Sequence, residues 1–196
     1  MATAGNLVFQ GNVIGEFAAY AADHGKRLWA FPTQTGMTIG PVTYEIDAEP
    51  YVSIAVGWGT VTGILGGPTV APLQMKNRSR LLTFRLGASA QLPDLPESVP
   101  VPLPDVPEQR ASVNTILEGH RFFATSCLVC HGFSAVSGGL VPDLRYSDQR
   151  VYAEWAAIAL GGSRYSNGMP PFGGIVTAEQ SQAIKAYIID RAHALR

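Results

Sequence analysis

A proline-rich segment, residues 87–111, places the strongest constraint on how this chain can fold. It contains six prolines, at positions 93, 96, 100, 102, 104 and 107. Proline lacks a backbone N–H and fixes φ, so the segment excludes helix and disfavours a central strand. We expect an extended polyproline II path that acts as a stiff linker, with disorder as the alternative. Six apolar side chains could hold it onto a neighbouring surface: Leu92, Leu95, Val99, Val101, Leu103 and Val106.

Residues 1–86, before this linker, have the pattern of short β-strands. Six apolar or alternating runs are separated by turn residues: LVFQGNV, EFAAYAA, RLWAFPT, PVTYEID, YVSIAVGW and RLLTFRL. Such spacing is typical of a sandwich, a barrel or propeller blades, and six strands make about one and a half four-stranded blades. The uncharged run between Glu49 and Lys76 is long enough to cross a bilayer, but its many glycines and prolines predict a buried strand plus loop. No transmembrane segment is therefore expected.

Residues 112–196, after the linker, have helical periodicity. The first helix is predicted in SVNTILEGHRFFA, with an apolar face of Val113, Ile116, Leu117, His120 and Ala124. A second is predicted from an N-cap at Ser147 to a stop at Gly161–Gly162, burying Val151, Trp155, Ile158 and Ala159. The last opens with the capping-box pattern Thr177 to Gln180 and buries Ile184, Tyr187 and Ile188.

The charge balance limits the partners of the chain. It has 14 basic and 15 acidic residues, a formal net charge of −1, which gives no electrostatic basis for binding nucleic acid. The opening MATAGNLVFQ lacks the basic and apolar regions of a secretory signal peptide.

Both cysteines lie in one short motif, Cys127-Leu-Val-Cys130-His131. This spacing is the haem c attachment pattern, in which two thiols bond to the porphyrin and the adjoining imidazole binds the iron. A zinc site would need further ligands that the sequence does not offer. A thioredoxin-like pair would follow a strand, whereas a helix is expected here, and a structural disulfide would not need the histidine. We therefore predict covalent haem c at Cys127 and Cys130, with His131 as an axial iron ligand.

The candidates for the sixth iron ligand are Met169, His193, His120 and the three other methionines. Met169 lies in the rigid loop NGMPPF, with enough chain after His131 to pass around a porphyrin. His193 is expected to face solvent near the chain end, and His120 to pack on the helix face. We predict Met169, and His/Met ligation is typical of an electron carrier.

Residues 112–196 resemble a class I cytochrome c. The resemblance lies in a helix with Gly119 and Phe123 leading into CLVCHG, the later GMPPF loop, and a last helix bearing Tyr187. It implies that the first and last helices cross where Gly119 meets Tyr187. It also suggests that Arg145 neutralises a haem propionate, with an ordinary surface arginine as the equal alternative.

The first 86 residues resemble the end of the propeller of a pyrroloquinoline quinone (PQQ) dehydrogenase. In AYAADHGKRLW, Ala19, Gly25 and Trp29 match the family's tryptophan-docking motif, although Ala21 replaces its aspartate. The order of parts resembles the C-terminal portion of a quinohaemoprotein alcohol dehydrogenase: last propeller strands, proline-rich linker, cytochrome. The resemblance implies PQQ and calcium for the whole protein. Nothing here matches the family's catalytic aspartate or calcium ligands, and Trp58 is the one residue that could line the quinone pocket, against the alternative of a core tryptophan.

The sequence thus predicts a two-part chain: an all-β partial propeller (1–86), a linker (87–111) and an all-α cytochrome c domain (112–196). Its expected function is electron transfer through haem c, from reduced quinone to an external acceptor. The alternatives are a subunit of a two-polypeptide alcohol dehydrogenase, or a haem-based redox- or gas-sensing module. By the resemblance the chain begins within a blade, so either it is a truncated gene product or another polypeptide supplies the remaining blades. Haem c attachment implies the periplasm, despite the missing signal peptide.

Overall fold

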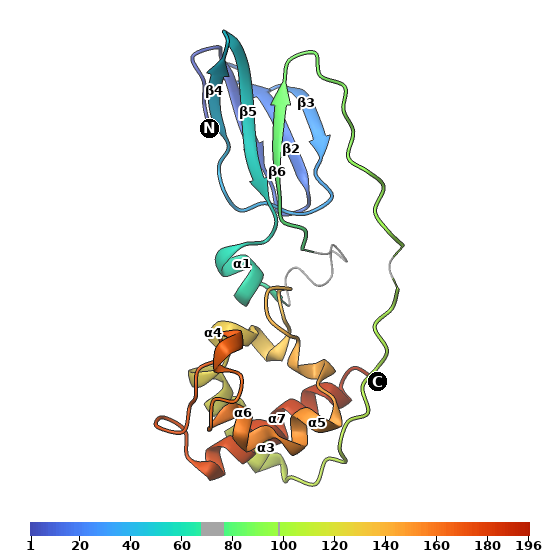
Figure 1. The fold of residues 1–196 in the computed structure, drawn as a ribbon, viewed down its shortest axis with the longest axis vertical. Helices are drawn as coiled ribbons and strands as arrows, with labels where there is room; N and C mark the ends of the chain where they lie inside the picture. Colours follow the sequence, from blue (N-terminus) through green and yellow to red (C-terminus); the bar gives the residue numbers. More distant parts are fainter. Residues whose placement is uncertain (68–76, 98) are drawn as a thin grey trace. The chain divides into compact units, whose positions relative to one another are not determined.

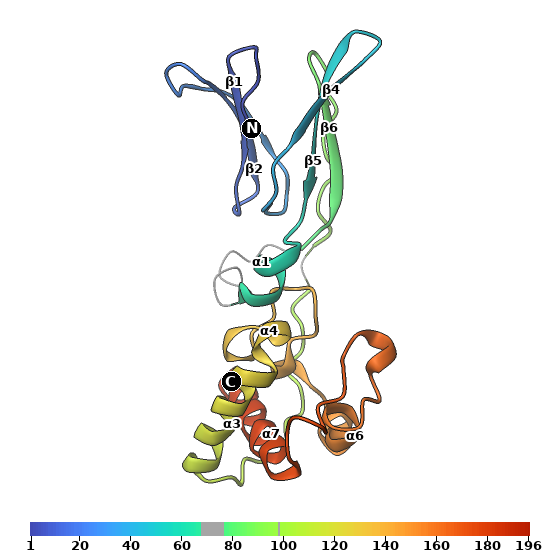
Figure 2. The same cartoon turned by 90° about the vertical axis from the view of Figure 1, so that its left-hand side faces the viewer.

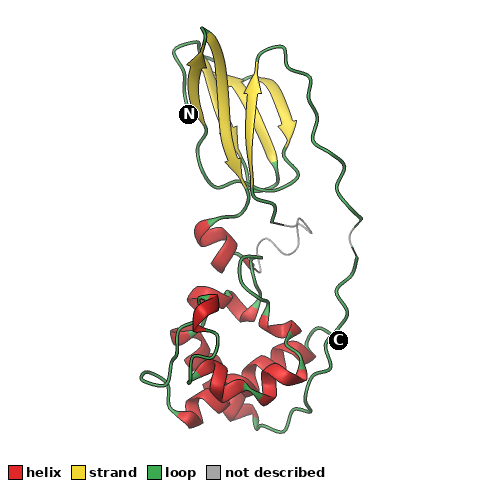
Figure 3. Cartoon of the chain, in the orientation of Figure 1, coloured by secondary structure: helices red, strands yellow, loops and turns green. Residues whose placement is uncertain are grey.

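The computed structural model describes residues 1–67, 77–97 and 99–196 of the chain. These residues divide into two compact units: 1–63 with 77–97 and 99, here called the β unit, and 64–67 with 100–196, here called the helical unit. Figure 3 shows strands in the first and helices in the second. The predicted order, an antiparallel β part followed by a helical cytochrome part, is confirmed.

The β unit contains two three-stranded antiparallel sheets, ordered β1-β2-β3 and β4-β5-β6 (Figures 1 and 2). Their strands are β1 (Leu7–Gly11), β2 (Glu16–Ala21), β3 (Arg27–Pro32), β4 (Val42–Ile46), β5 (Glu49–Val56) and β6 (Arg80–Arg85). All six predicted strands are present, with ends displaced by at most two residues. The first sheet is extended by an antiparallel bridge between Ala2 and Val8.

Aromatic contacts join the two sheets. Phe17 of β2 is fully buried, and its ring centroid lies 5.4 Å from that of Phe84 in β6. Trp29 pairs with Ala19 across β2 and β3 and meets Phe84 edge-on at 5.1 Å. The core of the β unit is completed by the buried residues Met37, Ile54 and Val56.

The helical unit is built around two crossing helices, α3 and α7. Its elements are α3 (Val113–Ser126), α4 (Leu128–His131), η2 (Phe133–Ala135), η3 (Leu144–Tyr146), α5 (Gln149–Ala153), α6 (Trp155–Ala159), η4 (Tyr165–Asn167) and α7 (Ala178–His193). A Cβ added at Gly119 would lie 1.9 Å from the Ala183 carbonyl oxygen and 3.0 Å from the Tyr187 Cβ. Only glycine permits this approach, so the crossing pair implied by the resemblance, Gly119 and Tyr187, is found.

Two helix predictions are wrong in detail. The chain after Ser147 forms two short helices rather than one, and the N-cap is Asp148, whose carboxylate accepts from the Val151 N–H at 3.0 Å. The face predicted for α3 is also displaced, because Val113 and Leu117 are exposed at 71% and 55%. Helix α7 packs on the side of α3 that carries Gly119 and Phe123. The prediction missed this side because it was made from apolar side chains, and glycine has none.

The run predicted as a buried strand plus loop contains an additional short helix. After β5, residues Thr60–Leu65 form α1, which the glycine content did not suggest. The end of this run falls within residues 68–76, which lie outside the described residues.

The second half of the proline-rich segment packs on the helical unit. Val106 is 7% exposed and belongs to its core. The Pro107 carbonyl lies 2.9 Å from His193 Nε2, and the Pro104 carbonyl accepts from the Arg196 guanidinium at 2.9 Å. The expectation that His193 faces solvent is therefore wrong, because this side chain holds the segment in place. Leu95, Val99, Val101 and Leu103 are exposed.

Candidate haem-attachment site

The thiol pair and its histidine lie on a single turn that continues α3. Cys127 is the C-cap of α3, where its N–H donates to the Phe123 carbonyl at 2.8 Å, and it is also the N-cap of α4. The N–H groups of Cys130 and His131 both donate to the Cys127 carbonyl, at 3.2 and 2.9 Å. The chain leaves this turn at Gly132, where φ is +74° and a Cβ would meet the Val136 carbonyl oxygen. The three residues of the motif are thus held together by backbone hydrogen bonds.

The two thiols have different surroundings. Both are free, with Cys130 exposed and Cys127 partly buried against the helical core. Burial, with a smaller contribution from the charge of Cys130, raises the pKa of the Cys127 thiol to about 11. Cys127 is therefore almost entirely protonated at neutral pH.

His131 is partly buried and has one ring nitrogen engaged. Its Nδ1 lies 3.4 Å from the Pro142 carbonyl oxygen, so Nε2 is the nitrogen available to a metal. Burial lowers the pKa of His131, against the smaller raising effects of the Pro142 hydrogen bond and the Asp143 charge. A neutral imidazole with its other nitrogen on a backbone carbonyl is the usual state of a metal-binding histidine.

Met169 lies in a loop of the same unit, between η4 and α7. Gly168 has φ +89°, and the Met169 N–H donates to the Arg164 carbonyl at 3.2 Å. The return of the loop is fixed to the end of α6, where the Phe172 and Gly173 N–H groups donate to the Ala159 and Leu160 carbonyls. The thioether is therefore carried by a loop whose two ends are hydrogen-bonded.

The residues present fit a covalently attached haem. Two unpaired thiols, and an imidazole whose Nε2 has no hydrogen-bond partner among the described residues, supply the donor set of haem c. Apolar side chains next to the motif are uncovered, with Val129 64% and Phe133 53% exposed. Tyr152 belongs to the apolar core against which Cys127 packs; it is 1% exposed, and its hydroxyl has no hydrogen-bond partner among the described residues.

The sequence did not single out three residues of the helical unit. The carbonyl of Pro142 carries no side-chain signal, and Tyr152 has the appearance of an ordinary helix residue. Asp143 accepts from the backbone N–H of Arg145 and caps η3, and an aspartate before a short helical turn is a signal that could have been read.

Trp58, the candidate quinone contact, belongs to the β unit. It is 3% exposed, its backbone N–H donates to Asn77 Oδ1 at 2.8 Å, and its ring lies against Gly36, where a Cβ would lie 1.9 Å from Nε1. The indole N–H has no partner among the described residues. The residue packs as a core tryptophan with one donor left without a partner among the described residues, and its contact with a quinone stays a prediction.

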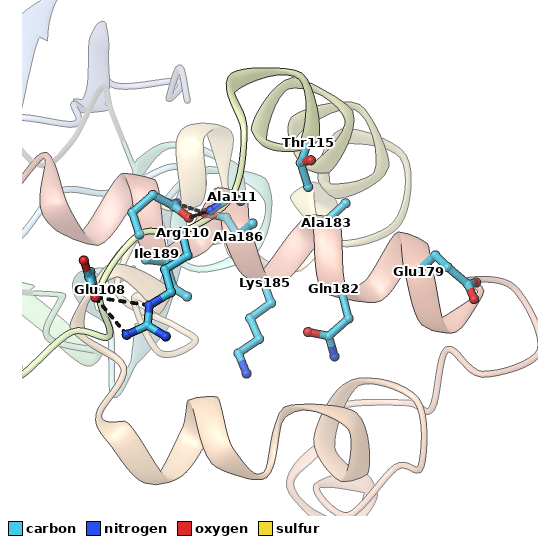
Figure 4. A pocket seen from close by; sticks show the side chains of 11 residues that line it. Glu108, Arg110, Ala111, Thr115, Glu179, Gln182, Ala183, Lys185, Ala186 and Ile189 are labelled. Atoms are coloured by element: carbon cyan, nitrogen blue, oxygen red, sulfur yellow. Dashed lines mark hydrogen bonds and ion pairs between the residues drawn. The ribbon is translucent and has the colours of Figure 1, made fainter.

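A separate surface groove lies between α7 and the end of the proline-rich segment (Figure 4). Lys185 and Gln182 of α7 line it, and Arg110 is paired with Glu108 at 3.0 Å. It contains no cysteine, histidine or methionine, so it is distinct from the candidate attachment site.

Across residues 1–67, 77–97 and 99–196, no group of three His, Cys, Asp or Glu side chains could hold a metal ion. The helices of these same ranges include none long and apolar enough to span a membrane.

Comparison with known proteins shows what the chain is similar to. Residues 114–188 match the family described as cytochrome C oxidase, cbb3-type, subunit III. The chain is 40% identical to the quinohemoprotein alcohol dehydrogenase ADH IIB of Pseudomonas putida, over 98% of this chain and 28% of that protein. The solved structure of the P. putida HK5 enzyme ADHIIG superposes with a TM-score of 0.85 at 38% identity, covering 100% of this chain and 28% of that one. The crystal structure of the quinohemoprotein alcohol dehydrogenase of Comamonas testosteroni superposes with a TM-score of 0.73 at 30% identity, covering 99% of this chain and 28% of that one.

These matches show which part of the longer relatives the chain corresponds to. It spans about 28% of the length of these relatives, in their C-terminal part. Its helical unit contains a cytochrome c domain.

Proposed function

We propose, from the homology of this chain to the C-terminal part of quinohemoprotein alcohol dehydrogenases, that it transfers electrons through one haem c. Cys127 and Cys130 would hold the haem covalently, and His131 and Met169 would bind its iron. The observation that carries the proposal is the turn 127–131, where two free thiols stand beside an imidazole whose Nδ1 already faces a carbonyl. The bound haem supplies a centre that gains and loses one electron.

The chain's own residues then set how that centre behaves. The backbone bonds within the turn hold His131 beside both thiols, and the hydrogen-bonded loop ends present Met169 with little further loss of entropy. A thioether ligand raises the reduction potential and closes the iron to oxygen and carbon monoxide. These features favour an electron carrier over a gas sensor.

The β unit supports a role within a larger propeller. Apolar side chains of its sheets are uncovered, including Val42 at 58%, Ile46 at 53% and Leu81 at 71%. We propose that further propeller blades, in the same or another polypeptide, cover these surfaces and carry PQQ, calcium and the catalytic aspartate. Trp58 would then contact the quinone. In this proposal the haem held by this chain would accept electrons from reduced quinone and supply them to an external acceptor in the periplasm, where haem c is attached.

The test is expression in the periplasm together with haem-maturation machinery. We expect an intact mass increased by one haem, lost in the double variant Cys127→Ala/Cys130→Ala. The reduced spectrum should not change under carbon monoxide, whereas Met169→Ala should bind it. Met37→Leu, which alters a buried methionine of the β unit, is the matched control and should behave like the parent.

Two results would contradict the proposal. Colourless protein in which both thiols can still be alkylated would show that no haem is attached. Carbon monoxide binding by the parent chain would favour the gas-sensing alternative. With PQQ, alcohol and a dye acceptor, we expect no turnover by this chain alone, because it has no match to the family's catalytic aspartate.

A further inference from the structure

The loop that faces His131 is braced by an ion pair. Asp143 and Arg145 make a two-pronged contact, from Arg145 Nε to Oδ1 at 2.9 Å and from Nη2 to Oδ2 at 2.7 Å. Their side chains are only 20% and 17% exposed. This is a partly buried, two-pronged pair, unlike the exposed pairs that contribute little to stability.

The same carboxylate also holds the backbone of the loop. Asp143 accepts from the backbone N–H of Ser137 at 3.2 Å and from that of Arg145 at 3.1 Å. Ser137 donates its hydroxyl to the Val141 carbonyl, and the Gly139 N–H donates back to that hydroxyl at 2.9 Å. The loop from Ser137 to Arg145 is therefore cross-linked through one carboxylate and one hydroxyl.

Pro142 lies inside this braced loop, directly before Asp143. Its carbonyl is the group that faces His131 Nδ1, at 3.4 Å. That distance is at the outer limit of a hydrogen bond, so a displacement of a few tenths of an ångström would abolish it. The contact therefore depends on how firmly the loop is held.

We infer that the Asp143–Arg145 ion pair is a positioning element for His131: it holds the Pro142 carbonyl against Nδ1 and thereby sets the donor strength of the imidazole. A hydrogen bond from Nδ1–H makes an imidazole a stronger ligand, which favours the oxidised metal. The pair thus lowers the reduction potential of the centre that His131 serves. This inference rests on the proposed function, because it requires His131 to bind the haem iron.

It also changes the role of Arg145. The sequence left open a propionate partner or a surface arginine. In the structure the guanidinium is engaged by Asp143, and that hydrogen bond is the main cause of the raised pKa of Arg145.

The experiment uses the full chain matured with haem, and begins with the parent. An attached haem and an NMR signal from iron-bound His131 establish the proposed function. Their absence would overturn the proposed function and this inference together, before any variant is made.

Two variants then test the ion pair, Asp143→Asn and Arg145→Gln. We expect both to raise the midpoint potential, by at least a threefold change in the one-electron equilibrium constant, about 28 mV. Both should also speed hydrogen exchange of the His131 Nδ1–H at least tenfold. Asp143→Glu, which keeps the carboxylate, should fall between the parent and Asp143→Asn. Glu108→Gln, which breaks the exposed Glu108–Arg110 pair, should change neither quantity.

The sign of the shifts separates positioning from charge. If the two residues act only as charges near the haem, removing the acid raises the potential and removing the base lowers it. Shifts of opposite sign, or unchanged exchange at His131 in both variants, would overturn the inference. If Asp143→Asn takes up no haem, Arg145→Gln and Asp143→Glu still decide it.

Discussion

Enlarging Gly119 by one methyl group tests the crossing of α3 and α7. In Gly119→Ala the new Cβ would lie 1.9 Å from the Ala183 carbonyl oxygen, about 1.5 Å inside ordinary contact, so the helices must separate. Overpacking of this kind costs about 1–3 kcal/mol. The same change in a free helix gains about 1 kcal/mol from helix propensity. We therefore expect a net loss of up to about 2 kcal/mol.

Urea unfolding of the haem-free chain, followed by the helical circular dichroism signal, measures this loss. The control is Glu118→Ala, one residue earlier on the exposed side of α3, which should change the free energy of unfolding by less than about 0.5 kcal/mol. A Gly119→Ala protein that is stabilised by about 1 kcal/mol would show that propensity alone acts there. The close approach of α3 to α7 would then be refuted.

Two further predictions concern the proline-rich segment and the thiols. Val106→Ala should destabilise the helical unit by about 1–2 kcal/mol because this side chain is 7% exposed, whereas Val101→Ala, at 68% exposed, should be nearly neutral in urea unfolding; equal effects would mean that the segment is not docked. In haem-free protein at pH 8, an alkylating reagent should modify Cys130 before Cys127, and Cys127 labelling should rise about tenfold per pH unit until its pKa of about 11, as read by peptide mass. Equal labelling rates of the two thiols at pH 8 would contradict the burial of Cys127. Because the pKa of Cys127 in the folded chain exceeds its ordinary value of 9.0, the free energy of unfolding should also fall as the pH rises from about 9 towards 11.

Much of the fold was predictable because it depends on local patterns. The six strands were predicted from short apolar or alternating runs separated by turn residues. The predicted capping box at Thr177 and Gln180 is present with both of its hydrogen bonds. What failed depends on tertiary contacts: the buried face of α3 is selected by Gly119, and His193 is turned inward by the Pro107 carbonyl. Ser147 and Asp148 are both good N-caps, and the sequence alone does not decide between adjacent candidates.

The haem-attachment motif stays a prediction, and it was made for a chemical reason. The spacing of Cys127, Cys130 and His131 specifies its partner without reference to the rest of the fold. The contact of His131 with the Pro142 carbonyl was not predictable, because the acceptor is a backbone group and the residues that hold it lie in an irregular loop. The roles of Met169 and Trp58 stay predictions, and the carbon monoxide experiment tests that of Met169.

The docked proline-rich segment determines where the chain can be cut to obtain the helical unit as an independent module. A cut at Ser112, where the helical pattern begins, would remove Val106 from the core and leave His193 and Arg196 without their carbonyl partners. A cut near Pro100 keeps all three. Anyone grafting this cytochrome onto another oxidoreductase should therefore transplant the eleven or so preceding residues along with it.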